Sequence, residues 1–359
     1  MSVDPGVEDW LRFTLVPGIG GATQRKLLKH FGSPAAALRA PASEVSALLS
    51  ATAASAWRAG ADVSEIGLVL AWLGEPGNHL LTLADAEYPP ALLETADPPT
   101  VLYVKGSVDR LSMPALAIVG SRNATPQGLS TARDFARALG SAGLTIVSGL
   151  ALGIDTAAHE GGLASSGSTV AVVGTGLDIV YPARNRDLAH RIAAEGAIVS
   201  EFPIGTKAIP SNFPRRNRLI SGLSRGVLVV EAAIRSGSLS TARFAGEQGR
   251  EVLAIPGSIH SPLSRGCHAL IKQGAKLVES ASDVLEELRL TSLAEEAMDP
   301  VSDDDPLLAA LGHDPCDFDT LSQRTGLPVG SLQTRLSELE LEGKIACLPG
   351  GRFQRLPTN

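Results

Sequence analysis

Two aliphatic runs joined by a helical segment decide the fold: ALAIVG (115–120), TPQGLSTARDFARALGSAG (125–143) and LTIVSG (144–149). The two runs lack polar alternation, which is typical of strands that are buried on both faces. Between them, apolar residues recur at helical spacing, at Ala132, Phe135, Ala136 and Leu139. We therefore predict two neighbouring strands connected by a helix.

The same pattern continues toward the C-terminus. Five further apolar runs start 25 to 29 residues apart: TVAVVG (169–174), AIVSEF (197–202), GVLVVEA (226–232), EVLAIPG (251–257) and KLVES (276–280). Each interval has room for one helix and two loops. The sequence thus predicts an α/β fold with a doubly wound, mostly parallel sheet of about seven strands.

Composition limits the class of protein. The chain has 359 residues, 44% of them hydrophobic and 19% charged, which excludes a wholly disordered chain and suits about two or three domains. Its three cysteines are scattered without CxxC spacing, so we expect neither a disulfide framework nor a zinc site. The sequence contains no 18-residue apolar run and begins without a signal-like segment, so we expect a cytoplasmic protein that does not enter a membrane.

The net charge of −7 hides a basic central segment. Residues 114–280 contain 17 Lys and Arg against 11 Asp and Glu, a balance of +6, whereas residues 1–113 carry −4 and 281–304 carry −7. Such asymmetry suggests a polyanionic partner for the central segment. An arginine-rich α/β domain without such a partner would show the same balance.

The carboxyl ends of the predicted strands are the place to look for a ligand. Small residues dominate there and at the start of a later helix: Gly120-Ser121-Arg122, Ser148-Gly149, Gly174-Thr175-Gly176 and Ser236-Gly237-Ser238. Such turns let backbone N–H groups approach an anion. The same residues also suit tight strand-to-helix turns that bind nothing.

The segment NFPRRNR (212–218) places three arginines next to Phe213. Proteins that bind single-stranded nucleic acid combine cations for phosphates with rings for bases in this way. The alternative is a solvated basic turn with Phe213 in the core.

Enzyme signatures are scarce. The sequence contains neither GxxxxGK[ST] nor HExxH, and Gly174-Thr175-Gly176 lacks the third glycine of a dinucleotide fingerprint. Asp155 and His159 stand four residues apart, which a helix cap and its neighbour explain more simply than an acid–base pair. We expect no catalytic residues, no metal and no cofactor.

The central motifs together resemble those of the DNA-processing protein A family, DprA or Smf. The resemblance rests on AIVGSRNATPQG (117–128), IVSGLALGIDTAAHEGGL (146–163), VAVVGTGLDIVYPARN (170–185), SEFPIG (200–205), NFPRRNRLISGLS (212–224), LVVEAAIRSGSLSTARFAGEQGREVLAIPGSI (228–259) and SRGCHALIKQGAKLV (264–278). It implies an extended Rossmann-like domain that binds single-stranded DNA and forms a homodimer. It also implies that the protein protects incoming DNA and helps to load RecA during natural transformation and recombination.

The resemblance also implies roles for particular residues. The family's S-R motif falls on Ser121 and Arg122, where a phosphate would lie. Its N-F-P-x-R-N-R motif places Phe213 against a base and makes the arginines clamps for the backbone. Some relatives carry a basic residue just before the Asn-Phe pair, whereas here Lys207 is the nearest cation.

Two flanking domains complete the predicted organisation. LVPGIGGATQRKLLKHFGSPAAAL (15–38) reads as a helix-hairpin-helix whose glycines could approach a DNA phosphate, or as a module for protein contact. Three helices and a β-wing around Pro349-Gly350-Gly351 indicate a C-terminal winged helix. Its acidic third helix, with Glu338, Glu340 and Glu342, favours a protein partner over DNA.

The predicted boundaries are a helical helix-hairpin-helix or SAM-like domain (1–80), a Rossmann-like DNA-binding domain (81–289), an acidic linker (290–304) and a winged-helix domain (305–359). We predict a non-enzymatic recombination mediator that binds single-stranded DNA and RecA. The expected DNA-binding residues are Gly120, Ser121, Arg122, Ser148, Gly149, Gly174, Thr175, Gly176, Lys207, Asn212, Phe213, Arg215, Arg216, Asn217, Arg218, Ser236, Gly237 and Ser238. The alternative is a nucleotide-binding or phosphoribohydrolase-like enzyme, for which Glu201 and Glu231 are the carboxylates near strand ends.

Overall fold

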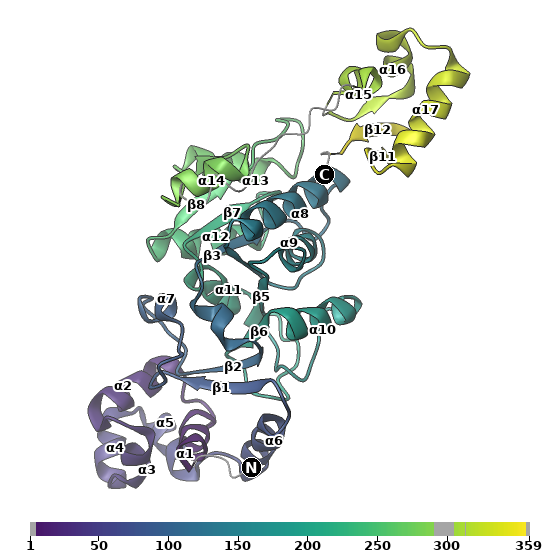
Figure 1. The fold of residues 1–359 in the computed structure, drawn as a ribbon. Coiled ribbons are helices and arrows are strands. Elements are labelled where there is room, and N and C mark those ends of the chain that lie inside the picture. Colours follow the sequence, from purple (N-terminus) through teal and green to yellow (C-terminus); the bar gives the residue numbers. More distant parts are fainter. Residues whose placement is uncertain (1–4, 291–304, 313, 357–359) are drawn as a thin grey trace.

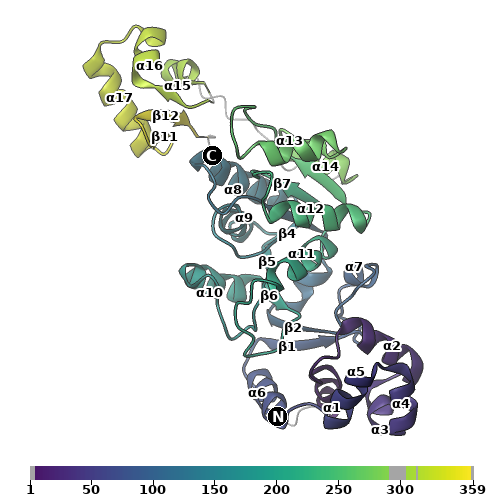
Figure 2. The ribbon, with the colours of Figure 1, turned by 180° about the vertical axis from the view of Figure 1, so that it is seen from behind.

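The computed structural model describes residues 5–290, 305–312 and 314–356 (Figure 1). Apart from its first residue, the predicted linker 290–304 lies outside the described residues. Figures 1 and 2 show the N-terminal helices at one end of a central sheet and the C-terminal segment beyond the other end.

The central sheet contains all seven predicted strands. They are β3 (Ala115–Val119), β4 (Thr145–Ser148), β5 (Thr169–Val172), β6 (Ala197–Ser200), β7 (Gly226–Val229), β8 (Glu251–Ala254) and β9 (Lys276–Leu277). All neighbouring pairs among them are parallel, in the order β6-β5-β4-β3-β7-β8-β9. The predicted doubly wound α/β fold is therefore confirmed.

Two strands at one edge of the sheet were not predicted. β1 (Asn78–Thr82) and β2 (Val101–Gly106) pair with each other and then with β6, both times in antiparallel fashion. They precede the regular strand and helix spacing and are separated by a connection that contains the short helix α7 (Pro90–Leu93). The described sheet thus has nine strands.

Helices cover both faces of the sheet. Four lie on one face: α8 (Pro126–Ser141), α9 (Ile154–Leu163), α10 (Arg186–Glu195) and α14 (Ala281–Glu287). Three lie on the other: α11 (Asn212–Gly222), α12 (Ser238–Glu247) and α13 (Arg265–Lys272). Fully buried residues such as Ile118, Leu139 and Ile146 each contribute about 1.5–3 kcal/mol by leaving water.

From residue 5 onward, the described N-terminal segment forms six helices: α1 (Pro5–Thr14), α2 (Gly21–Phe31), α3 (Pro34–Arg39), α4 (Ala42–Leu48), α5 (Ala51–Ala59) and α6 (Val63–Leu73). Between α1 and α2, Gly18 has a φ of +77°, a conformation that favours glycine. The buried amide of Gln24 donates to the carbonyls of Thr14 and Ile19, at 3.0 and 2.9 Å, and so closes the hairpin. Leu11 and Leu15 pack against Tyr103 of β2 and join these helices to the sheet.

The C-terminal segment has the predicted winged-helix form. It contains α15 (Pro306–Leu311), β10 (Cys316–Asp317), α16 (Phe318–Thr325), α17 (Val329–Leu341), β11 (Ile345–Leu348) and β12 (Arg352–Arg355). Gly350 and Gly351 turn the β11–β12 hairpin with positive φ angles. Among the described helices of the whole chain, none is long and apolar enough to cross a membrane.

Candidate functional site

The direction in which the chain adds strands to the sheet reverses between β3 and β7. From β3 the chain builds outward through β4, β5 and β6, and then returns to place β7 on the other side of β3. Loops that leave neighbouring strands in opposite directions open a crevice at the carboxyl edge of such a sheet. A cavity of about 670 Å³, which we call the switch-point cavity, lies at this position.

The switch-point cavity brings together half of the predicted site residues. These are Gly120, Ser121, Arg122, Phe213, Arg216, Asn217, Ser236, Gly237 and Ser238. Further lining residues were missed, among them Asn123, Tyr181 and Arg235. Asn123 and Arg235 adjoin predicted site residues in the sequence, and Tyr181 lies in the segment that follows a predicted strand, which is the signal that could have identified these three.

The loop after β3 is held by a close backbone approach. Gly153 has a φ of +78°, and a Cβ there would lie 2.2 Å from the carbonyl oxygen of Ser121. The amide of Ile154 donates to that same oxygen at 3.1 Å, and the Ser121 hydroxyl accepts from the amide of Asn123 at 3.1 Å. The loop is therefore fixed while the side chain of Arg122 stays exposed.

Arg122 and Arg235 carry the available positive charge of the switch-point cavity. Both are exposed, and within the described part of the chain neither guanidinium has a hydrogen bond or an ion pair. An unpaired guanidinium presents its full set of donors to a phosphate oxygen. These two groups can accept an anion without first releasing a carboxylate.

An aromatic pair forms one side of the switch-point cavity. The rings of Tyr181 and Phe213 lie 5.4 Å apart and are tilted by 39°. Phe213 rests on Gly174, where a Cβ would come within 3.1 Å of the ring, and Asn212 donates to the Gly174 carbonyl at 3.2 Å. Gly174 thus supports the ring, whereas we expected it to contact a ligand. Tyr181 is 49% exposed and is available for stacking.

The polar groups of the loop and helix beneath the cavity, which we call the floor, form hydrogen bonds with one another. The carboxylate of Asp155 accepts from the amides of Gly149 and Ala151, at 3.1 and 3.3 Å. His159 accepts from the amide of Leu150 at 3.3 Å, and its Nδ1 lies 2.7 Å from Thr169 Oγ1. Burial lowers the pKa of His159 to about 3 and raises the pKa of Asp155. These two residues therefore hold the loop.

Ser148 and Gly149 belong to this floor. The Ser148 hydroxyl donates to the carbonyl of Ile118 at 2.7 Å, and the amide of Gly149 is occupied by Asp155. Their polar groups are engaged inside the protein, in contrast to the expectation that they bind DNA.

Arg216 is placed differently from the expected phosphate clamp. It is only 4% exposed and donates to the carbonyls of Gly149, at 2.7 Å, and Val172. Burial lowers the pKa of Arg216 to about 10, opposed by the attraction of Asp155, so the guanidinium stays charged at neutral pH. Its donors thus join the ends of β4 and β5 under the cavity.

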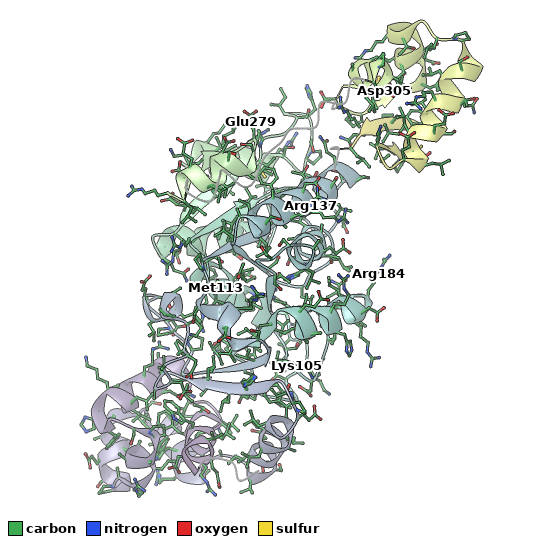
Figure 3. The ribbon with its side chains drawn as sticks, in the orientation of Figure 1. Lys105, Met113, Arg137, Arg184, Glu279 and Asp305 are labelled. Carbon is green, nitrogen blue, oxygen red and sulfur yellow. The ribbon has the colours of Figure 1, made fainter. Side chains whose placement is uncertain are left out.

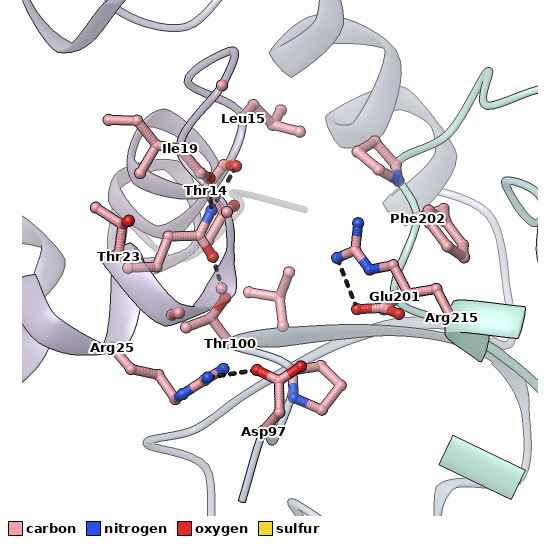
Figure 4. Close-up of a pocket in the computed structure, with 18 of the residues that line it drawn as sticks. Thr14, Leu15, Ile19, Thr23, Arg25, Asp97, Thr100, Glu201, Phe202 and Arg215 are labelled. Carbon is pink, nitrogen blue, oxygen red and sulfur yellow. Dashed lines mark hydrogen bonds and ion pairs between the residues drawn. The ribbon is translucent and has the colours of Figure 1, made fainter. Parts of the chain in front are cut away.

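Arg215 and Arg218 point to the opposite side of α11. They line a second cavity of about 610 Å³ between the α1–α2 hairpin and the sheet, which we call the interdomain cavity (Figure 4). Both guanidinium groups bind the same oxygen of Glu201, at 3.0 and 2.6 Å. Asp97 binds Arg218, at 3.3 Å, and also Arg25. Every arginine that lines this cavity is therefore paired.

The remaining predicted residues lie outside both cavities. The Thr175 hydroxyl donates to the carbonyl of Ile179 at 2.9 Å, and the amide of Gly176 donates to Thr206 at 2.9 Å. Both residues are buried. Lys207 is exposed in the loop that follows β6.

The carboxylates that the enzyme alternative requires take part in structural contacts. Glu201 binds Arg215 and Arg218, and Glu231 accepts from the amide and the hydroxyl of Thr125, at 2.9 and 2.6 Å. Burial raises the pKa of Glu231. Among the described residues, no group of three or more His, Cys, Asp or Glu side chains could hold a metal ion.

One further enzyme-like pattern lies at the wrong edge of the sheet. Residues 222–226, GLSRG, have the GxSxG spacing of a nucleophile elbow, which requires a turn from a strand into a helix. Here the segment leads from α11 into β7. Ser224 is buried, and its hydroxyl donates to the carbonyl of Ile220 at 2.9 Å.

The fold and the site define a class of protein: a Rossmann-like α/β protein with an arginine-bearing cavity at its switch point, flanked by a helical segment and a winged helix. A family described as DNA recombination-mediator protein A matches residues 79–289, and the DprA winged helix domain matches residues 292–351. The chain belongs to the DNA recombination-mediator protein A family, also called DprA or Smf.

Individual relatives agree with this assignment. The protein Smf of Escherichia coli is 46% identical over 294 residues, covering 79% of each chain. The X-ray structure of DNA processing protein A from Streptococcus pneumoniae is 36% identical with a TM-score of 0.69, covering 80% of this chain and 99% of that one. A structure describing the single-stranded DNA binding mode of the Helicobacter pylori protein is 32% identical with a TM-score of 0.54, covering 59% and 96%.

Proposed function

We propose that this protein binds single-stranded DNA in the switch-point cavity and acts as a DNA-processing protein in transformation and recombination. One observation carries the proposal: two unpaired arginines, Arg122 and Arg235, share a cavity with the aromatic pair Tyr181 and Phe213. Phosphate-binding cations beside stacking rings suit a single strand, whose bases are free to stack.

The distribution of unpaired charge supports a polyanionic ligand at this edge. Among the described residues from 114 to 290, six cations without a side-chain partner lie on segments that follow strand ends, namely Arg122, Arg184, Arg186, Lys207, Arg235 and Arg265. Three lie elsewhere, namely Arg225, Lys272 and Arg289. The basic balance of the central segment is thus concentrated on one edge of the sheet.

Fluorescence anisotropy with a labelled oligo-dT of about 35 nucleotides tests this function. Phe213→Ala should weaken binding about tenfold or more, because stacking contributes about 1–3 kcal/mol per base. Arg122→Ala should weaken it about fivefold at 0.1 M salt and make the salt dependence shallower by about 0.7. The control is Arg225→Ala, an exposed, unpaired arginine at the amino end of β7, which should bind like the wild type.

Three results would contradict the proposal. Equal binding to a duplex of the same length would remove the preference for a single strand. Unchanged affinity in both variants would move the binding site away from the switch-point cavity. Competition by a mononucleotide at the same concentration as the oligonucleotide would favour a nucleotide-binding protein instead.

We further propose that the protein protects the incoming strand and passes it to RecA, as a cytoplasmic homodimer. Kinship supports these roles. Nuclease resistance of a bound strand, RecA filament formation on strands coated with a single-strand binding protein, and mass by light scattering test them separately. A strict monomer at micromolar concentration would contradict the dimer.

We propose the domain division given above, with the winged helix as a protein-contact module. Glu338 of α17 and Glu342, directly after this helix, lie within ion-pair distance of Arg335, which also binds Asp305. The recognition helix therefore presents little free positive charge to a phosphate backbone. Limited proteolysis tests the boundaries, and duplex binding by residues 305–359 would contradict the assigned role.

A further inference from the structure

The segment from Tyr181 to Arg186 forms an arm beside the switch-point cavity. It follows β5 at the carboxyl edge and contains η2 (Ala183–Asn185), directly before α10. Its first residue, Tyr181, lines the cavity and contacts Phe213. The arm therefore leads from the aromatic pair to the outer surface of the domain.

A buried asparagine anchors the middle of this 181–186 arm. Asn185 is only 5% exposed, and its amide nitrogen lies 2.9 Å from the carbonyl oxygen of Leu150 and 3.0 Å from Thr156 Oγ1. A third contact, at 3.3 Å, reaches the carbonyl oxygen of Ala151, which also lines the cavity. The arm is thus fixed to the cavity floor.

Two arginines flank this anchor and have no partner. Arg184 and Arg186 are exposed, and within the described residues neither side chain makes a hydrogen bond or an ion pair. Figure 3 shows Arg184 projecting outward beside α10. Asp187 is the nearest carboxylate along the chain and leaves the arm with a positive balance.

The absence of a partner distinguishes Arg184 and Arg186 from arginines of α10 and α8 that form ion pairs. Arg191 of α10 lies 4.0 Å from Glu195, one turn further on. Arg133 of α8 binds Glu160 at 2.7 Å. Unpaired arginines on a rigidly anchored segment retain their whole charge for a ligand, since no carboxylate must first be displaced.

We propose that the 181–186 arm is a second phosphate-binding site, which holds the backbone of a DNA strand as it leaves the switch-point cavity. Three residues span at most about 11 Å, so Arg184 lies within a few nucleotides of a base stacked on Tyr181. The contact is with phosphate alone and does not depend on base sequence. This inference rests on the proposed binding of single-stranded DNA.

Strand length is the variable that isolates the arm. The double variant Arg184→Ala/Arg186→Ala is compared with the wild type on oligo-dT of about 6 nucleotides, which fills the cavity alone, and of about 20 nucleotides, which also reaches the arm. On the longer strand, affinity at 0.1 M salt should fall roughly 25-fold and the salt slope should become shallower by about 1.4, or 0.7 per phosphate contact. On the shorter strand, neither quantity should change.

Two further variants separate charge from structure. Arg191→Ala removes a paired arginine from the same helix and should bind both strands like the wild type. Asn185→Ala keeps both arginines but removes the anchor, and it should weaken binding to the longer strand more than to the shorter one. Circular dichroism of each variant should match that of the wild type.

The outcomes are distinguishable. If the double variant keeps the wild-type salt slope on the longer strand, the proposed role of the arm is wrong. A loss of affinity in Arg122→Ala would still support DNA binding in the switch-point cavity. An equal loss in the double variant on both strands would also overturn the role of the arm, since the arm would then act on the cavity itself. If the wild type shows no salt-dependent binding to either strand, both proposals fail.

Discussion

Helix α11 separates two cavities of similar size whose arginines are in opposite states. On the switch-point side, neither Arg122 nor Arg235 has a partner among the described residues, and the exposed Tyr181 lies beside the half-buried Phe213. On the interdomain side, Arg215 and Arg218 share Glu201, and Arg25 binds Asp97. Figure 4 shows the Arg215–Glu201 and Arg25–Asp97 pairs. The first cavity can receive an anion, whereas the second has already neutralised its cations.

The difference between the two cavities shows how a helix distributes the side chains of one continuous motif over two faces. In NFPRRNR, residues 213, 216 and 217 share one face because they are three and four positions apart. Arg215 and Arg218 share another face for the same reason. A motif that reads as one basic patch therefore supplies a ring to one cavity, ion pairs to the other and a buried guanidinium between them.

The largest effect should come from the buried guanidinium. Arg216→Ala should lower the free energy of unfolding by about 3–5 kcal/mol, because it leaves the buried Asp155 without its compensating charge. Urea denaturation measures this loss. The control Arg133→Ala removes an exposed ion pair with Glu160 and should cost less than about 1 kcal/mol. Equal costs would erase the distinction between buried and surface arginines.

Acid should loosen the floor of the switch-point cavity. The pKa of His159 is lowered by burial to about 3, against about 6.5 in an unfolded chain, so its neutral form belongs to the folded state. Stability that is complete above pH 6.5 should be lost as the pH falls toward 3, by about 1.4 kcal/mol per pH unit from this group. Denaturation from pH 7 to 5 should show a shallower slope for His159→Gln than for the wild type, and the exposed His190→Gln serves as control. Parallel slopes for all three proteins would refute the assignment.

Charge removal should affect the two cavities differently. Arg122→Ala should weaken binding to oligo-dT about fivefold at 0.1 M salt, whereas Arg215→Ala should change it less than about twofold because Glu201 already neutralises Arg215. Glu201→Gln releases Arg215, whereas Arg218 keeps Asp97 as its partner, and this variant should strengthen binding. Anisotropy titrations of the three variants measure these affinities. A larger loss of affinity in Arg215→Ala than in Arg122→Ala would mean that the interdomain cavity, and not the switch-point cavity, binds the strand.

The smallest effect should come from the support of the ring. In Gly174→Ala the new methyl group lies 3.1 Å from the Phe213 ring, which must shift by a few tenths of an ångström. Binding to oligo-dT should weaken by about 0.5 kcal/mol, roughly twofold, because stacking is disturbed but not removed. Gly246→Ala is the control, since open space surrounds a Cβ at that exposed position of α12. Full affinity in Gly174→Ala would mean that the ring position is not limiting.

Much of the fold could be predicted because its signals are local. Strands β3 to β9 begin within one residue of the starts of the predicted runs. A strand that is buried on both faces needs apolar residues at successive positions, so an uninterrupted aliphatic run indicates it directly. β1 and β2 escaped prediction because they precede the regular spacing and pair in antiparallel fashion. The helical hairpin could also be predicted from Gly18, and the winged helix from the turn at Gly350 and Gly351.

The sequence by itself thus determined the doubly wound sheet, the carboxyl edge at which we propose that DNA binds, and the basic character of that edge. Only the tertiary structure decided which residues work together there. It placed β7 beside β3, buried Arg216, paired Arg215 and Arg218 with Glu201, and brought Tyr181 against Phe213. The reason is that strand and helix formation depend on neighbours along the chain, whereas burial and pairing depend on residues that are distant in sequence and meet only after folding.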